Sequence, residues 1–207
     1  MRVHRVAAVA GFVCAVLLVV NSARRAGFLP ENALTHAIAP FGALTGLLAI
    51  TGIYLVIRGT AGTLGLVGYV LNSAGLAGAF AIEYILHFVF PYLGGGTVSG
   101  LLAGSTGRAF LVTSVVLVAG ALTFSAAAIR SGVMPVVGVL LYAVGMLPGS
   151  LRNLVPVPVY LAGLLVAAAG VAWMSARLWA TEEKALAYEE VREPAVRSAR
   201  RGVRPTG

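Results

Sequence analysis

Glu83 and His87 are the only residues in a long apolar run, residues 61–93, that titrate near neutral pH. They stand four positions apart, so their side chains can touch on one helix face. A run of this length and composition is typical of a membrane-spanning helix. A carboxylate inside such a helix is costly unless it faces a partner or a wet cavity. The pair could therefore form a structural ion pair, exchange protons with a ligand, or contribute to a metal site.

Helical geometry adds Asn72 to the same face. At about 100° per residue, Asn72 falls within about 60° of Glu83 and His87. Gly75 and Gly78 lie in the same stretch, and small residues let a neighbouring helix approach closely. The stripe is therefore expected to face other helices and not lipid.

The composition requires that most of the chain lie in lipid. Of its 207 residues, 59% are hydrophobic and only 11% are charged, whereas soluble domains carry about 25% charged residues. The apolar runs and the Gly, Pro and Arg residues between them predict an all-α bundle of six transmembrane helices. We expect these spans at about residues 3–22, 34–57, 64–92, 108–129, 133–147 and 157–179.

The segments outside these spans need separate interpretation. Residues 3–22 could be a cleaved signal peptide or a retained span; we favour the span, because Arg24 and Arg25 follow it directly. The Gly-rich segment 94–107 lacks the Gly-Lys-Ser/Thr end of a phosphate loop, so we expect a flexible loop. Residues 181–207 are expected to begin as a helix and continue as a partly disordered basic tail.

The net charge of +8 comes from residues at the ends and in loops, without interleaved aromatic residues. This pattern favours contact between the tail and anionic lipid headgroups, and argues against nucleic-acid binding. The single Cys14 excludes an internal disulfide. We predict no cofactor, and we leave open a membrane-protein partner or a homo-oligomer.

Basic residues also indicate the orientation. With six spans, the side that holds the termini carries eleven Lys and Arg residues and the other side carries four, which places both termini in the cytoplasm. The four are Arg24, Arg25, Arg108 and Arg152. His36 and His87 then lie near the outer interface with Arg108 and Arg152, and Glu83 lies roughly 6 Å deeper than His87.

Three interpretations of these residues remain open. Glu83 could be structural, paired with His87 or Arg108 or kept protonated by burial. Glu83 and His87 could be a proton-coupled or ligand-binding element of a small transporter or an accessory subunit of a membrane complex. His36, Glu83 and His87 could instead form the metal or catalytic site of an intramembrane enzyme, since two imidazoles and a carboxylate bind zinc in many proteins. The absence of an HExxH pair favours a non-enzymatic function.

The last third of the chain carries two segments with recurring helix-boundary residues, SGVMPVVGVLLYAVGMLPG (131–149) and VPVPVYLAGLLVAAAGVAWMSARLW (155–179). This part resembles the C-terminal half of a loose group of six-span bacterial membrane proteins, many of them actinobacterial, that are classed as a domain of unknown function. The resemblance implies a fold and a membrane location, and it implies no activity.

Overall fold

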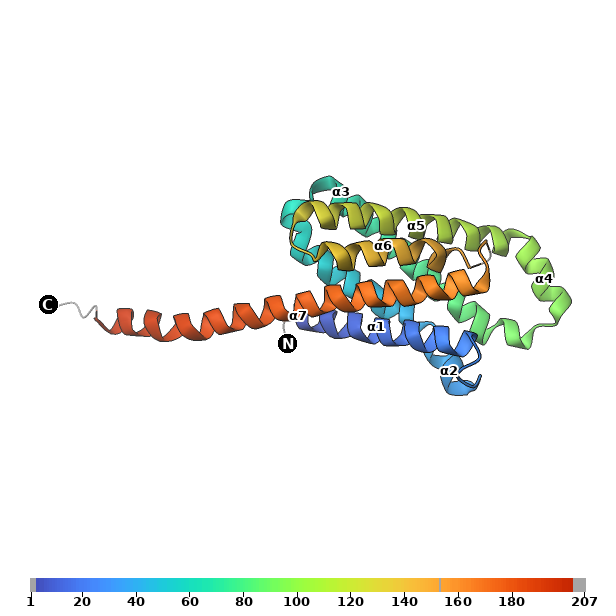
Figure 1. Cartoon of the computed structure of the whole chain (residues 1–207), viewed down its shortest axis with the longest axis horizontal. Helices are drawn as coiled ribbons and strands as arrows, with labels where there is room; N and C mark the ends of the chain where they lie inside the picture. The colour runs from blue at the N-terminus through green and yellow to red at the C-terminus, as the bar shows by residue number, and fades with distance from the viewer. Residues whose placement is uncertain (1–2, 153, 203–207) are drawn as a thin grey trace.

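The computed structural model describes residues 3–152 and 154–202, with side chains up to Thr181 (Figure 1). The described residues form helices and connecting loops, without a strand. In chain order the elements are α1 (Val3–Arg25), α2 (Ala33–Ile38), α3 (Phe41–Phe88), the 3-10 turn η1 (Phe90–Tyr92), α4 (Gly95–Ala103), α5 (Ser105–Ser131), α6 (Val136–Ser150) and α7 (Val157–Gly202). The all-α fold class is therefore as predicted.

Helix α3 is two antiparallel helices joined by a sharp bend. Gly62 has φ 57° and ψ −156°, a backbone conformation that only glycine adopts readily. The two halves, residues 41–61 and 63–88, fold against each other: the ring centroids of Tyr54 and Tyr69 are 4.4 Å apart, and Thr51 lies within hydrogen-bond distance of the Tyr69 hydroxyl. The bend thus supplies the second and third of the predicted spans.

The long helices pack in a closed ring. α1 contacts α3 and α7, α7 contacts α6, α6 contacts α5, and α5 returns to α3. The shared core contains Ile53, Phe124 and Met174, each almost completely buried. Because the chain runs up and down, the end of α1, both ends of α3, the end of α6 and the start of α7 meet at the end of the bundle marked by α2 and α4 in Figure 1.

Close helix contacts depend on glycine. A Cβ atom on Gly75 would lie 2.5 Å from the Leu117 Cα atom, and one on Gly120 would lie 2.2 Å from the Asn72 backbone nitrogen. At these glycines the backbones of α3 and α5 come into direct contact, as they do at small residues in membrane bundles. The same device joins α6 to α7, where a Cβ on Gly145 would lie 2.3 Å from the Ala167 nitrogen.

A methyl group at these positions should therefore push two helices apart. We expect Gly75→Ala and Gly120→Ala each to lower the free energy of unfolding by about 1–3 kcal/mol, the usual cost of overpacking. Gly59→Ala is the matched control, since nothing lies within 4 Å of its added Cβ, and it should be neutral or slightly stabilising. Thermal unfolding in detergent measures all three; equal melting temperatures for Gly75→Ala and Gly59→Ala would contradict the close-packing account.

The outer surface of the bundle is apolar. Four segments are long and apolar enough to cross a membrane: Val3–Arg25, Ala33–Tyr92, Ser105–Ser131 and Val157–Thr181, of which the second contains the bend; Val136–Ser150 is a shorter apolar helix. Large apolar side chains stand exposed along these helices, among them Val16, Leu48, Val70, Val112, Val144 and Leu165. So extensive an exposed apolar surface is compatible with a membrane protein.

Three segments differ from the sequence-based expectation. The expected helix at 34–57 is divided at Pro40 into α2 and the first half of α3, because proline cannot donate the backbone bond that would continue the first helix. The Gly-rich segment 94–107 contains helix α4 where we expected a flexible loop. α7 continues through Gly202, since its Glu, Ala and Arg residues favour a helix; the rest of the expected disordered tail, residues 203–207, lies outside the described residues.

Candidate functional site

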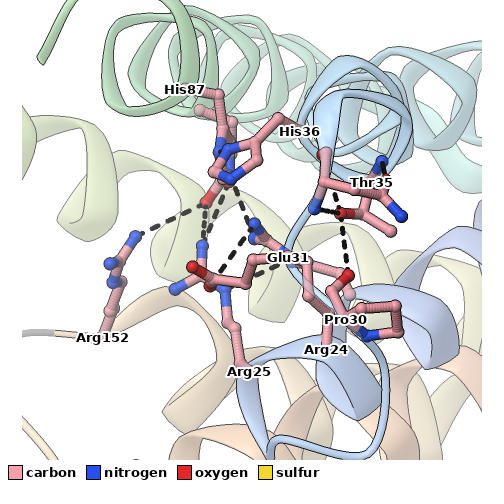
Figure 2. Close-up of polar contacts among 11 residues, drawn as sticks. Arg24, Arg25, Pro30, Glu31, Thr35, His36, His87 and Arg152 are labelled. Carbon is pink, nitrogen blue, oxygen red and sulfur yellow. Dashed lines mark hydrogen bonds and ion pairs between the residues drawn. The ribbon is translucent and has the colours of Figure 1, made fainter. Parts of the chain in front are cut away.

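A cluster of charged and imidazole side chains lies at the α2 end of the bundle (Figure 2). Its members come from the last turn of α1, from α2, from the last turns of α3 and from the α6–α7 connection. They are Arg24, Arg25, His36, Glu83, His87 and Arg152, and we call them the Glu83 cluster. Chain segments far apart in sequence therefore converge on one carboxylate.

Local structure fixes the position of each contributor. α1 ends directly after the two arginines in a Schellman motif: the Phe28 N–H donates to the Ala23 carbonyl, and the N–H of Gly27, at φ 81°, donates to the Arg24 carbonyl. α2 begins with a capping box in which Asn32 and Thr35 satisfy each other's backbone N–H groups. His36 follows this box directly, and so is held in the last turn of this short helix.

Glu83 is the centre of the cluster. Arg25 Nη2 lies 3.0 Å from Oε1 and 3.1 Å from Oε2 of the carboxylate, and His87 Nε2 lies 3.2 Å from Oε2. Arg152 Nη1 lies 3.9 Å from Oε1, beyond hydrogen-bond distance. The side chains of Arg25 and Glu83 are only 13% and 17% exposed, so the charges are paired in surroundings of low polarity, where pairing matters most.

Asn21 and Tyr160 hold the arginines in place. The Asn21 Oδ1 atom accepts hydrogen bonds from Arg24 at 2.9 Å and from Arg25 at 3.3 Å. The Arg25 guanidinium also lies over the Tyr160 ring, 5.5 Å from its centroid, where the ring face attracts a cation. The arginines are thus oriented independently of the carboxylate.

The Nε2 atom of His87 lies between a hydrogen-bond donor, Arg24, and a hydrogen-bond acceptor, Glu83. This atom is 3.2 Å from Arg24 Nη2 and 3.2 Å from Glu83 Oε2. Arginine only donates hydrogen bonds and a carboxylate only accepts them. Nε2 therefore accepts from Arg24 when it carries no proton, and donates to Glu83 when it carries one.

The second ring nitrogen of His87, Nδ1, contacts His36 of α2. His36 Nδ1 and His87 Nδ1 are 2.8 Å apart, and a hydrogen bond between two ring nitrogens holds one proton. His36, His87 and Glu83 thus form a continuous chain along which a proton can move by changes of tautomer. Imidazoles commonly serve as proton shuttles of this kind.

Two cavities border the Glu83 side chain. A cavity of about 110 Å³ inside the bundle reaches from Asn21 and Glu83 past Cys14 to Tyr142. A larger one of about 520 Å³ lies between the second half of α3, α5 and the α6–α7 connection, and Glu83 and Arg152 line it. The volume of the larger cavity is within the range of small-molecule sites.

Arg152 is the least satisfied cation of the cluster. Its side chain is 42% exposed, and within the described part of the chain it makes no hydrogen bond. Burial lowers the pKa of its guanidinium, the nearby Arg25 lowers it further, and Glu83 acts in the opposite direction. Arginine nevertheless remains charged at neutral pH, so this group attracts an anion.

Of the residues singled out from the sequence, His36, Glu83 and His87 come together. Arg108 does not join them: it is exposed at the start of α5, and its side chain makes no hydrogen bond or ion pair with another described residue. Neither Arg25 as the partner of Glu83 nor Arg24 as the partner of His87 was predicted from the sequence. The available signal was a pair of arginines directly after an apolar run, Arg24 and Arg25, where two adjacent cations call for partners.

Asn72 makes a different contact, deeper in the bundle. It is completely buried, and its Nδ2 donates to the Tyr142 hydroxyl at 2.9 Å while that hydroxyl donates to its Oδ1 at 3.0 Å. The stripe on α3 therefore carries two separate polar sites, the Glu83 cluster at the end of the bundle and an α3–α6 bridge in its centre.

Replacing either residue of the Asn72–Tyr142 bridge should lower the stability of the protein. Asn72→Leu or Tyr142→Phe leaves a buried polar group unpaired, and we expect each to lower the free energy of unfolding by about 1–3 kcal/mol. The double variant should lose less than the sum of the two single losses, because no orphaned group remains. Chemical unfolding of the four proteins measures the coupling, and strictly additive losses would show that the bridge contributes nothing.

Within the described part of the chain, no group of three or more His, Cys, Asp and Glu residues has the arrangement of a metal site. The resemblance noted for the last third of the chain stays a prediction. No protein-family model, no curated protein and no solved structure matches this chain.

Proposed function

We propose that this protein is a small proton-coupled carrier of anions in the cell membrane, with six spans, both termini in the cytoplasm and the Glu83 cluster at the outer end. Residues 3–25 then serve as a retained span, which the packing of α1 against α3 and α7 supports. The excess of Lys and Arg on the side of the termini supports the orientation.

One observation carries the proposal: the carboxylate that borders both cavities is bound by an arginine and by a histidine. Glu83 contacts Arg25 and His87 and lies near Arg152. It also lines both the smaller and the larger cavity. Ionisable residues inside a membrane commonly mark ion pathways and proton relays. A purely structural ion pair would need neither the adjoining cavities nor the histidine chain.

The proposed coupling follows from charge competition. While Glu83 is ionised, it occupies Arg25 and offsets the charge of Arg152. A proton delivered through His36 and His87 neutralises the carboxylate and frees both guanidinium groups for an anion. Binding the anion and binding the proton are then linked, because either one favours the other.

Proteoliposomes test this function. Purified protein in phosphatidylcholine vesicles that enclose a pH dye is exposed to gradients of chloride, methanesulfonate and decanesulfonate, anions that keep their charge at neutral pH. The wild type should carry protons in the direction of the gradient of at least one of them. Glu83→Gln should reduce this flux to that of empty vesicles.

Glu31→Gln is the matched control for this experiment. Glu31 also lies near the cluster, 3.9 Å from Arg24, but its side chain is 67% exposed, so its loss should leave the flux unchanged. Proton flux that persists in Glu83→Gln, or is absent from the wild type with every anion tested, would refute the proposal.

The long helix α7 favours a second candidate, an accessory subunit of a membrane complex. Its C-terminal part extends away from the bundle (Figure 1), at the end proposed to be cytoplasmic, where a partner or anionic lipid headgroups could bind. Pull-down from mild detergent, with the full chain and with a chain ending at Thr181, tests this candidate. A partner retained equally by both would contradict a role for the extension.

A further inference from the structure

The larger cavity has one charged end and mostly apolar walls, among which Thr113 and Ser114 of α5 are the polar exceptions in the described lining. Ile82 and Leu86 of α3 and Phe110 and Leu111 of α5 line it. Glu83, Arg152 and Ser150 line the same cavity where α6 ends. Leu102 and Leu111 at its edge are exposed, in the part of the surface that would face lipid. A ligand in this space would meet apolar side chains over most of its length and a charged group at one end.

Two polar groups at this end are unpaired or incompletely paired. The Ser150 Oγ atom is buried and makes no hydrogen bond within the described part of the chain, although Ser150 is only 9% exposed. Arg152, two residues further on, has only its 3.9 Å ion pair with Glu83. Buried hydroxyls are normally hydrogen-bonded, so an unpaired one beside an incompletely paired guanidinium indicates a place for an acceptor oxygen that carries negative charge.

We infer that this cavity binds an anionic amphiphile with a single hydrocarbon chain, with its acidic head on Arg152 and Ser150 and its chain between α3 and α5. A carboxylate, phosphate or sulfonate head supplies acceptor oxygens to both groups. The hydrocarbon chain matches the leucine and phenylalanine walls, which a small hydrophilic anion would leave uncovered. Entry at the lipid-facing edge would spare the chain a passage through water.

Glu83 sets the condition for binding, and here the inference rests on the proposed function. The carboxylate lines the same cavity and would repel an anionic head while ionised. Around this carboxylate lie Arg25 of α1, His87 of α3 and Arg152 of the α6–α7 connection. Arg24 of α1 and His36 of α2 contact His87, and Tyr160 of α7 lines the cavity. With Glu83 protonated, these groups leave the cavity positively charged.

Photolabelling of the full chain tests the inference directly. The probe is decanesulfonate with a diazirine on its chain, added to protein in phosphatidylcholine nanodiscs, and labelled residues are identified by mass spectrometry. We expect the label on the cavity walls, at residues 82–86 and 110–117. Unlabelled decanesulfonate should displace the probe, whereas methanesulfonate and decanol should compete at least about tenfold less well, because each lacks either the chain or the charge.

Two variants locate the head group. Arg152→Gln should weaken labelling about tenfold or more, since a charge-assisted hydrogen bond is lost, while Arg130→Gln, a substitution of an exposed arginine at the other end of α5, should not change it. The competition among the three ligands in wild-type protein keeps the test valid if Arg152→Gln fails to fold. Label spread over the lipid-facing residues of α1, or decanol competing as well as decanesulfonate, would overturn the inference.

These results separate this inference from the carrier proposal. Specific labelling without proton movement would refute proton-coupled transport and support the binding site. Proton movement driven by chloride or methanesulfonate, without specific labelling, would support the carrier and refute the amphiphile.

Discussion

Arg25→Met should lower the free energy of unfolding by about 3–5 kcal/mol, the usual cost of removing one member of a buried ion pair. The variant leaves Glu83 in a poorly hydrated position without its hydrogen-bonded cation, because Arg152 is 3.9 Å away. The loss should be greater at pH 8 than at pH 5, since protonation neutralises a carboxylate that has lost its partner. Unfolding in mixed micelles of increasing SDS content, followed by circular dichroism, measures this loss of stability.

Two further variants make this result specific. Arg25→Met combined with Glu83→Leu removes both charges and should recover most of the lost stability, because apolar replacements of buried pairs are often neutral or stabilising. Arg108→Met replaces an exposed arginine whose side chain has no polar partner in the described part of the chain, and it should change stability by no more than about 0.5 kcal/mol. If Arg25→Met resembled Arg108→Met at pH 8, the ion pair would not stabilise the fold.

The affinity for an anionic amphiphile should depend strongly on pH. The proposed anion-binding form has a protonated Glu83, so binding is full below the titration of this carboxyl and weakens as the pH rises through it. Above that point, the association constant for decanesulfonate should fall about tenfold per pH unit. Glu83→Gln, which mimics the protonated acid, should bind with little dependence on pH. Equilibrium binding to protein in nanodiscs, corrected for empty nanodiscs, gives both curves.

His36→Asn distinguishes the acceptor of the proton from the path by which it arrives. His36 contacts His87 and not Glu83, so the variant should keep the equilibrium pH dependence and slow the approach to equilibrium. A wild-type curve that is flat with pH, or a Glu83→Gln curve as steep as that of the wild type, would show that another group carries the coupling.

Sequence patterns predicted the all-α fold class because apolar runs of this length have few alternatives. They also predicted the Glu83–His87 contact, since an i,i+4 spacing on a helix fixes a distance by itself. His36 was predicted near this pair only by counting spans, and the structure brings its ring to His87. These predictions depend on local geometry and on the number of chain reversals, which a single sequence supplies.

The remaining contacts depend on how helices rotate and shift against one another. Asn72 shares a face with Glu83, but eleven residues on a helix correspond to about 16 Å along its axis, so it meets Tyr142 of α6. Arg25 reaches Glu83 because α1 ends in a Schellman motif directly after it, whereas Arg108 is exposed at the start of α5. No spacing in the sequence distinguishes these two arginines; the packing of α1 against α3 does.

The central claim is that Glu83 exchanges an arginine for a proton when an anion binds. Calorimetric titration of the protein with decanesulfonate at neutral pH, in two buffers with different heats of ionisation, counts the protons taken up. The account predicts uptake of about one proton per anion in the wild type and none in Glu83→Gln. Binding without proton uptake in the wild type, or the same uptake in both proteins, would contradict it.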